Sequence, residues 1–186
     1  TAIGVDSLAY AVDNDHNTAV GYAAGHQTTG NRNSFFGVGA GSFATNVDDC
    51  VAIGYQALKA LDSAGDNSDN ATGNANIAIG NYSLDANTTG SSNVAIGHQA
   101  ATALAGGNYN IAIGKGALQT EDLTHGTVAI GYETLQDQNS TLANNVAIGY
   151  QAAVNLSSGT DSVYMGHLAG GAGVITGDNN VAIGKG

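Results

Sequence analysis

The chain repeats one short motif, an apolar residue, a small residue, an apolar residue and then glycine, at a spacing of about 17 residues. The motif glycines are spaced almost evenly from Gly4 to Gly184, except for one longer gap between Gly54 and Gly80. Self-similarity at a fixed period is the signature of a repeat architecture, so we expect one array over residues 1–186 with a loop insertion at about 62–72. The eleven copies are at residues 2–4, 18–21, 34–37, 51–54, 77–80, 94–97, 111–114, 128–131, 146–149, 163–166 and 181–184.

A unit of about 17 residues is too short for a helical hairpin, but it can hold two short strands and two turns. We therefore expect an all-β chain, a parallel β-solenoid of about 11 coils, with the motif as one strand of each coil. A second strand is predicted after the motif glycine, as at Ala117-Leu118, with the leucine pointing inward. A second glycine, usually seven residues before the motif glycine, suits the other corner of the coil: Gly30, Gly73, Gly90, Gly107, Gly159 and Gly177.

Strand periodicity places the two large residues of each motif on one face and the small residue on the other. In Val94-Ala95-Ile96, we expect the valine and isoleucine to fill the coil interior and Ala95 to point outward. Alanine holds the small position in nine of the eleven motifs, so an exposed alanine column about 50 Å long would result. Such a column favours self-association, although a monomer with a flat alanine face is the alternative.

The composition excludes several classes of partner. With 15 Asp and Glu against 4 Lys and Arg, the formal net charge is -11, which disfavours nucleic acid and anionic membrane surfaces. No apolar run approaches the roughly 18 residues of a membrane span. The absence of proline suits stacked strands that need every backbone N–H, and the lone Cys50 excludes an intrachain disulfide. Other motifs have Asn, Ser or Thr in the position of Cys50, so we interpret it as a tolerated small residue.

The segments Asn93-Val94-Ala95-Ile96-Gly97-His98-Gln99-Ala100 and Asn145-Val146-Ala147-Ile148-Gly149-Tyr150-Gln151-Ala152 resemble the head repeats of YadA-type trimeric autotransporter adhesins. They are equally similar to phage tail fibres built from the same unit, and the resemblance covers essentially the whole chain. It implies a left-handed parallel β-roll, a homotrimer around a threefold axis and a role in adhesion. Phe35 and Tyr164 depart from the family pattern because they stand where the small residue is expected.

Few residues suggest chemistry. The five histidines, His16, His26, His98, His125 and His167, lack paired ligand spacing, so no metal site is predicted, and no catalytic or cofactor-binding residue is predicted either. Calcium is an open alternative at two acidic stretches, which are otherwise solvated loops. Their candidate ligands are Asp13, Asp15 and Asn17, and Asp62, Asp66 and Asp69. Tyrosines that follow a motif glycine, such as Tyr22, either shield a corner or stack on sugar rings.

These observations predict a non-enzymatic fibre module, a trimeric rod that attaches to a host-surface glycan or protein. A virus tail fibre, displayed on the virion surface, is the favoured context, and the head of a bacterial adhesin on the cell surface is the alternative. A monomeric surface-binding solenoid and a tailspike glycosidase are further alternatives, but they would need Thr-x-Thr arrays or grouped carboxylates. We expect the chain to be a fragment of a longer fibre.

The insertion yields a first prediction, since the motif resumes in phase at Ile77. Deleting about nine residues within 62–72 should leave assembly and thermal stability nearly unchanged, because an insertion disturbs a solenoid least at a solvent-facing corner. Light scattering and thermal denaturation of the deletion variant check this. Loss of assembly would instead make the insertion part of a contact between chains.

Overall fold

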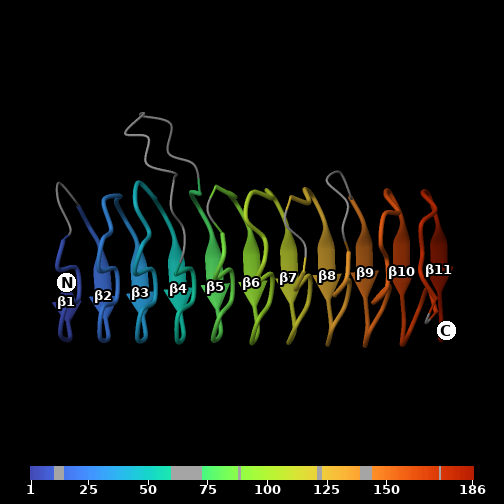
Figure 1. Ribbon diagram of the computed structural model, residues 1–186, viewed down its shortest axis with the longest axis horizontal. Coiled ribbons are helices and arrows are strands. Elements are labelled where there is room, and N and C mark those ends of the chain that lie inside the picture. Colours follow the sequence, from blue (N-terminus) through green and yellow to red (C-terminus); the bar gives the residue numbers. More distant parts are fainter. Residues whose placement is uncertain (11–14, 60–72, 88, 121–122, 139–143, 172) are drawn as a thin grey trace.

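The computed structural model describes residues 1–10, 15–59, 73–87, 89–120, 123–138, 144–171 and 173–186, so the predicted insertion at 62–72 lies outside the described residues. The described residues form eleven short strands in one parallel sheet whose strand order is the chain order (Figure 1). The described part contains no helix, and the prediction of an all-β chain is confirmed. The strands are β1 (Ala2–Ile3), β2 (Thr18–Val20), β3 (Ser34–Phe36), β4 (Val51–Ile53), β5 (Ile77–Ile79), β6 (Val94–Ile96), β7 (Ile111–Ile113), β8 (Val128–Ile130), β9 (Val146–Ile148), β10 (Val163–Met165) and β11 (Val181–Ile183).

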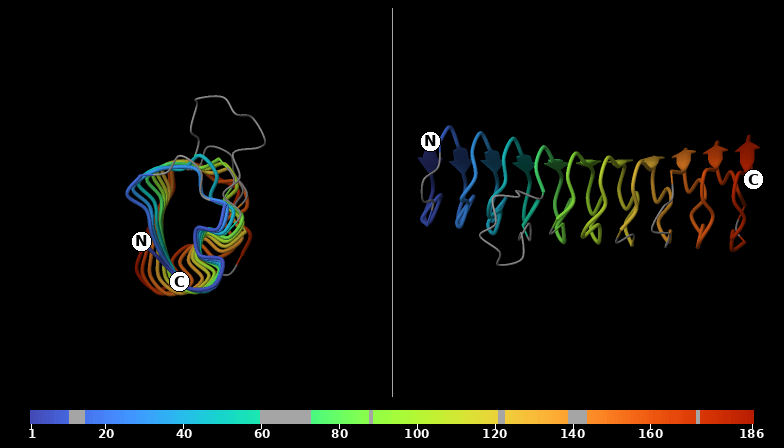
Figure 2. Two further views of the ribbon diagram at one scale, coloured as in Figure 1. Left: turned by 90° about the vertical axis from the view of Figure 1, so that its left-hand side faces the viewer. Right: turned by 90° about the horizontal axis from the view of Figure 1, so that it is seen from above.

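Each strand pairs with the next at equivalent motif positions, so that Ala95 of β6 lies beside Ala112 of β7. Outside the strands, the backbone continues the same pattern, because Leu118 N–H donates to the Thr134 carbonyl at 3.0 Å, one repeat further along the chain. Seen end-on, the successive coils overlay one another (Figure 2). The repeat therefore forms a parallel β-solenoid, as the motif spacing predicts.

The expected assignment of the two strand faces is wrong. The small residue of each complete motif points into the coil, since Ala95 and Ala147 are completely buried within a single chain. The flanking Val94 and Ile96 instead lie partly exposed on the outer face of the sheet. The alanine column is therefore interior and cannot contact another chain. A coil this short encloses little volume, and a narrow interior accepts methyl groups where isoleucine would overfill it.

The segment after the motif glycine is a turn, so the predicted second strand is also wrong. Its residues alternate between ordinary and left-handed backbone, with φ of 52° at Gln56 and 53° at Leu58. This alternation curls the chain, whereas a strand needs a continuous run of extended residues. The leucines nonetheless point inward as predicted, because Leu58, Leu84 and Leu118 are completely buried. Leucine from the turn and alanine from the strand together fill the coil.

Phe35 and Tyr164 also occupy the interior, although the sequence places them between chains. Both side chains are at most 2% exposed. Glycines in the adjacent turns make room, since a Cβ on Gly41 would lie 2.5 Å from the Phe35 ring and a Cβ on Gly170 would lie 2.9 Å from the Tyr164 ring. The chain thus keeps the interior filled by exchanging small and large residues between the strand and the turn.

A row of buried polar side chains stands immediately before the strands, and sequence analysis missed its role. The Asn93 Oδ1 accepts from the Asn110 N–H at 2.9 Å, while the Asn93 Nδ2 donates to the Gly107 carbonyl at 2.7 Å. Asn33 and Asn145 make the equivalent contacts in their own coils. Each asparagine therefore pairs a buried backbone N–H and a buried carbonyl that would otherwise lack partners at the corner. Asn87 is likewise buried, and its Oδ1 accepts from the Gly90 N–H.

The motif glycines allow the coils to stack at strand spacing. Gly97 has φ of +137°, and a Cβ there would lie 2.6 Å from the Gly114 carbonyl oxygen of the next coil. The second glycine serves close approach, as predicted, because a Cβ on Gly30 would lie 1.7 Å from the Val47 oxygen. The corners at Gly97 and Gly30 thus each need a residue without a side chain.

The stacking of these glycines yields a prediction. Gly97→Ala should destabilise the protein by about 3 kcal/mol or more, because it combines a disfavoured φ with a backbone clash. For a chain of this size, thermal denaturation followed by circular dichroism should show a midpoint lower by roughly 6–12 °C. Gly173→Ala is the control, since a Cβ there meets nothing within 4 Å. Equal midpoints for the two variants would contradict the tight stacking.

Candidate interaction surfaces

The outer face of the sheet carries a continuous apolar strip, which we call the sheet strip. It consists of the first and third residues of the strands, and none of these side chains is buried. Several are markedly exposed, including Phe36 at 39% and Ile53 at 40%. Its members are Ile3, Val20, Phe36, Val51, Ile53, Ile77, Ile79, Val94, Ile96, Ile111, Ile113, Val128, Ile130, Val146, Ile148, Val163, Met165, Val181 and Ile183, with Thr18 and Ser34 as polar exceptions.

The size of the sheet strip is set by strand geometry. Eleven strands about 4.8 Å apart span roughly 50 Å, and three residues along each strand span about 10 Å, so the strip covers on the order of 500 Å². A patch of this size matches the largest apolar patch on a typical monomer, and such patches are often functional. The strands lie in one row along a side of the rod (Figure 2), and in the part of the chain that the structure describes no other segment packs over them.

The second surface is the corner of the coil formed by the residues that follow the motif glycines. The sequence predicts exposed tyrosines there. Tyr22 and Tyr150 are 56% and 47% exposed, which confirms that position. Towards the C-terminus the side chains form a ladder, since the rings of Tyr132 and Tyr150 stack at 5.1 Å and those of Tyr150 and His167 at 5.2 Å. The Lys115 ammonium lies 5.5 Å from the Tyr132 ring centre and extends the ladder by a cation–π contact. We call this row the corner ladder.

Neighbouring groups shift the pKa values of several side chains on this corner. A hydrogen bond to the Glu133 carboxylate raises the pKa of Tyr132, and the same bond, with one from Gln151, lowers the pKa of Glu133. The Gln151 Nε2 donates to Glu133 Oε2 at 2.8 Å. In an earlier coil, desolvation raises the pKa of Tyr82, whose ring packs edge-on against Tyr55 with centres 5.3 Å apart. Tyr82 and Tyr132 therefore remain neutral hydroxyl donors.

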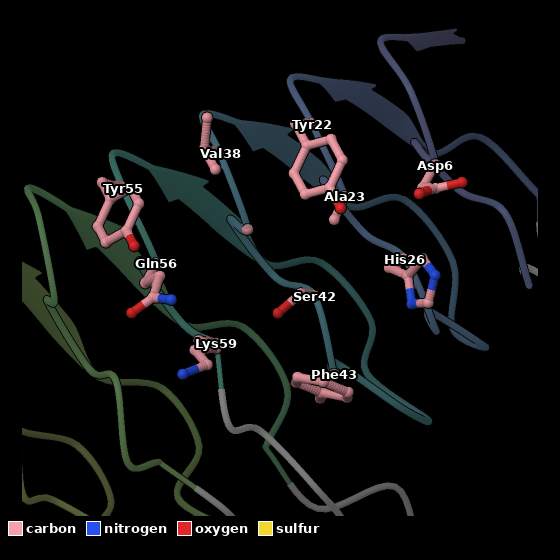
Figure 3. A pocket seen from close by; sticks show the side chains of 11 residues that line it. Asp6, Tyr22, Ala23, His26, Val38, Ser42, Phe43, Tyr55, Gln56 and Lys59 are labelled. Atoms are coloured by element: carbon pink, nitrogen blue, oxygen red, sulfur yellow. The ribbon is translucent and has the colours of Figure 1, made fainter.

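At β3 the same corner carries no aromatic ring. Val38 and Gly39 stand there, and a groove of about 350 Å³ opens between the coils of β2 and β4. Tyr22 and Tyr55 lie on either side of Val38, as Figure 3 shows, and polar side chains line the groove below them. The polar and charged lining residues are Asp6, His26, Ser42, Gln56 and Lys59.

The candidate metal ligands are not brought together where the structure describes them. Asn17 belongs to the buried asparagine row, because its Oδ1 accepts from the Asn33 N–H and its Nδ2 donates to the Gly30 carbonyl. Its side-chain oxygen is therefore committed to the backbone, which argues against a calcium site with Asp15. Asp13, Asp62, Asp66 and Asp69 lie outside the described residues.

The histidines lie in separate coils. His98 and His167 are on the corner with the tyrosines, His26 packs edge-on against Tyr10 at 4.8 Å, and the His125 Nδ1 accepts from the Asn108 N–H at 3.0 Å. Among the described residues, no group of three or more His, Cys, Asp or Glu could hold a metal ion, and no helix is long and apolar enough to cross a membrane.

Cys50 takes the position of an asparagine in the buried row. The Asn33 Oδ1 accepts from the Cys50 N–H at 2.9 Å, and the Cys50 Sγ lies 3.4 Å from the Gly73 carbonyl oxygen. Burial raises the pKa of the Cys50 thiol to about 11. A buried thiol that stays protonated is a poor nucleophile, which agrees with a packing role.

Comparison of the chain with protein-family models, curated proteins and solved structures gave no match. Any assignment of function therefore depends on the geometry of the two surfaces and on the repeat itself.

The contact between Tyr132 and Glu133 yields a prediction. Glu133→Gln removes the negative charge that the tyrosinate would face, so the pKa of Tyr132 should fall towards the ordinary tyrosine value. Ultraviolet or NMR titration of the Tyr132 phenol measures this change. Asp161→Asn, at an exposed corner elsewhere, should leave the Tyr132 titration unchanged. An unaltered pKa in Glu133→Gln would contradict the hydrogen bond.

Proposed function

We propose that this chain is a non-enzymatic fibre module, a homotrimeric rod that serves host attachment, and most specifically part of a virus tail fibre. Within this proposal, the rod has about 11 coils of left-handed β-roll, and it works by presenting surface to a glycan or protein receptor. The observation that carries the proposal is the sheet strip, an apolar face uncovered along the array. The head of a bacterial trimeric adhesin would use the same rod, and the domains flanking the array would distinguish the two contexts.

The sheet strip favours a second copy of the chain as its occupant. Its apolar ridges repeat at strand spacing, and another copy of the same rod offers ridges at the same spacing along its whole length. Burying about 500 Å² on each chain would contribute on the order of 10 kcal/mol of transfer free energy per chain, before the entropic cost of association. The threefold symmetry itself comes from the resemblance to trimeric adhesins and tail fibres.

The proposed adhesive role rests on what remains outside the sheet strip. The corners differ in sequence from coil to coil, whereas the strands barely change. A trimer would present each corner three times, so that a weak contact gains avidity without a deep pocket. Recognition by repeated weak contacts suits an attachment fibre better than turnover of a substrate.

The assembly proposal predicts that charge in the sheet strip separates the chains without unfolding them. Val94→Arg combined with Ile96→Arg should convert a trimer to monomers, because an unpaired charge would be buried between chains. Light scattering measures the mass, and far-ultraviolet circular dichroism should remain that of a β-solenoid. Tyr109→Arg is the matched control, since this 71% exposed side chain lies outside the strip.

Ala95→Arg distinguishes the two faces of the strand. It should disrupt folding itself, because Ala95 is buried within one chain. A wild-type protein that stays monomeric at micromolar concentration would contradict the trimer. A strip variant that stays trimeric would place the interface elsewhere.

Attachment is tested with the assembled wild-type protein on a glycan array and on a panel of bacterial cells. The proposal expects saturable binding to cells and no release of reducing sugar from any bound polysaccharide. Release of reducing sugar would overturn the non-enzymatic role. A complete absence of cell binding would leave this array a spacer and contradict attachment by the rod.

A further inference from the structure

The groove at β3 lies where Val38 stands between two tyrosines on the corner, and we call this position the vacancy; rings are also absent at Val5, Asn81, Lys115 and Lys185. In the later coils, Tyr132, Tyr150 and His167 occupy successive positions, and each ring stacks on the next at 5.1 to 5.2 Å. At the corresponding corner of β2, β3 and β4 the residues are Tyr22, Val38 and Tyr55 (Figure 3). Two aromatic walls therefore stand two coils apart, about 10 Å, with no ring between them.

The residues at the vacancy leave room for a ring. Val38 is shorter than tyrosine, and Gly39, like Gly116, has no side chain where Gln56 and Glu133 stand in other coils. A Cβ on Gly39 would come no closer than 3.5 Å to the Gln56 side chain, so the missing side chain at Gly39 is not required by packing there. The groove volume of about 350 Å³ lies within the range of small-ligand sites.

The lining of the groove combines aromatic rings with polar side chains. Phe43 is 43% exposed beside the groove, and together with Tyr22 and Tyr55 it supplies apolar ring surface. The Ser42 hydroxyl and the Gln56 amide face the same space, and among the described residues neither side chain forms a hydrogen bond within the chain. Asp6 and Lys59 add opposite charges towards the two ends.

We infer that this groove binds one pyranose ring of a surface glycan between Tyr22 and Tyr55. A pyranose has C–H groups on its faces, which stack on aromatic rings, and hydroxyls around its edge, which hydrogen-bond to polar side chains. A flat, purely apolar group would satisfy the walls but leave the Ser42 and Gln56 groups without partners. This inference rests on the proposed attachment function and specifies the ligand and the place.

An open groove of this kind binds weakly, with a dissociation constant on the order of millimolar for a single sugar. Repetition in an assembled rod would raise the avidity of a glycan chain by one or more orders of magnitude. The groove therefore suits a receptor that presents many copies of the same sugar.

The test uses a variant that fills the vacancy. Val38→Tyr supplies the missing ring, occludes the groove and removes none of the polar lining. The matched control is Tyr109→Ala, which removes an exposed ring that does not line the groove. Thermal denaturation should show that both variants remain folded, because both positions are exposed.

Binding is measured by saturation-transfer NMR with the assembled protein and the methyl pyranosides of glucose, galactose, mannose and N-acetylglucosamine. We expect at least one pyranoside to bind the wild type, Tyr109→Ala to bind it equally, and Val38→Tyr to bind it at least about tenfold more weakly. Tyr55→Ala, which removes one wall, should weaken binding in the same direction.

The remaining outcomes separate this site from the proposed function. Equal sugar binding by Val38→Tyr and the wild type would place glycan recognition elsewhere on the rod and leave attachment standing. Cell attachment without binding of any pyranoside would overturn the glycan site alone, and competition by free tyrosine would identify a protein side chain as the occupant. Loss of both sugar binding and cell attachment would overturn the site and the attachment function together.

Discussion

The whole structure depends on superposition of each coil on the next at the spacing of hydrogen-bonded strands. Backbone N–H groups donate to carbonyls about one repeat away all around the coil, as between Leu118 and Thr134. At this spacing a motif glycine such as Gly97 has no room for a side chain, and a buried asparagine such as Asn93 must pair the backbone groups at the corner. The sequence repeats because each coil must meet the same requirements to stack on the next.

Much of this architecture follows from the sequence, because a short, regular period with one brief strand per unit admits few structures. The strand positions, the two glycine corners and the inward leucines are all predicted correctly. The face of the strand that points inward is not predicted correctly. A two-residue period separates the two faces of a strand but does not show which of them is interior. The orientation depends on interior volume, and Leu118 from the turn already occupies the space that isoleucine would need.

The turn after the motif was beyond sequence reasoning for a different reason. Left-handed backbone at Gln56 and Leu58 is unusual for residues other than glycine, and only the stacked copies above and below hold it in place. The recurrence of Asn93 and Asn145 before the strand was a usable signal, because a polar residue that recurs beside an apolar motif indicates a buried hydrogen-bond partner. For the exposed groove at Val38, the sequence showed only a missing tyrosine, and its significance depends on the ring spacing in the fold.

Departures from the repeat fall into two kinds, and the difference bears on function. Inside the coil they are compensated, as Phe35 is by Gly41 and Tyr164 by Gly170, so the interior remains filled. Outside, the change to Val38 and Gly39 has no compensating side chain and leaves a groove. Packing accounts for the first kind, since an uncompensated interior change would cost stability. It does not account for the second kind, so the exposed departures are the positions at which a repetitive rod can distinguish one partner from another.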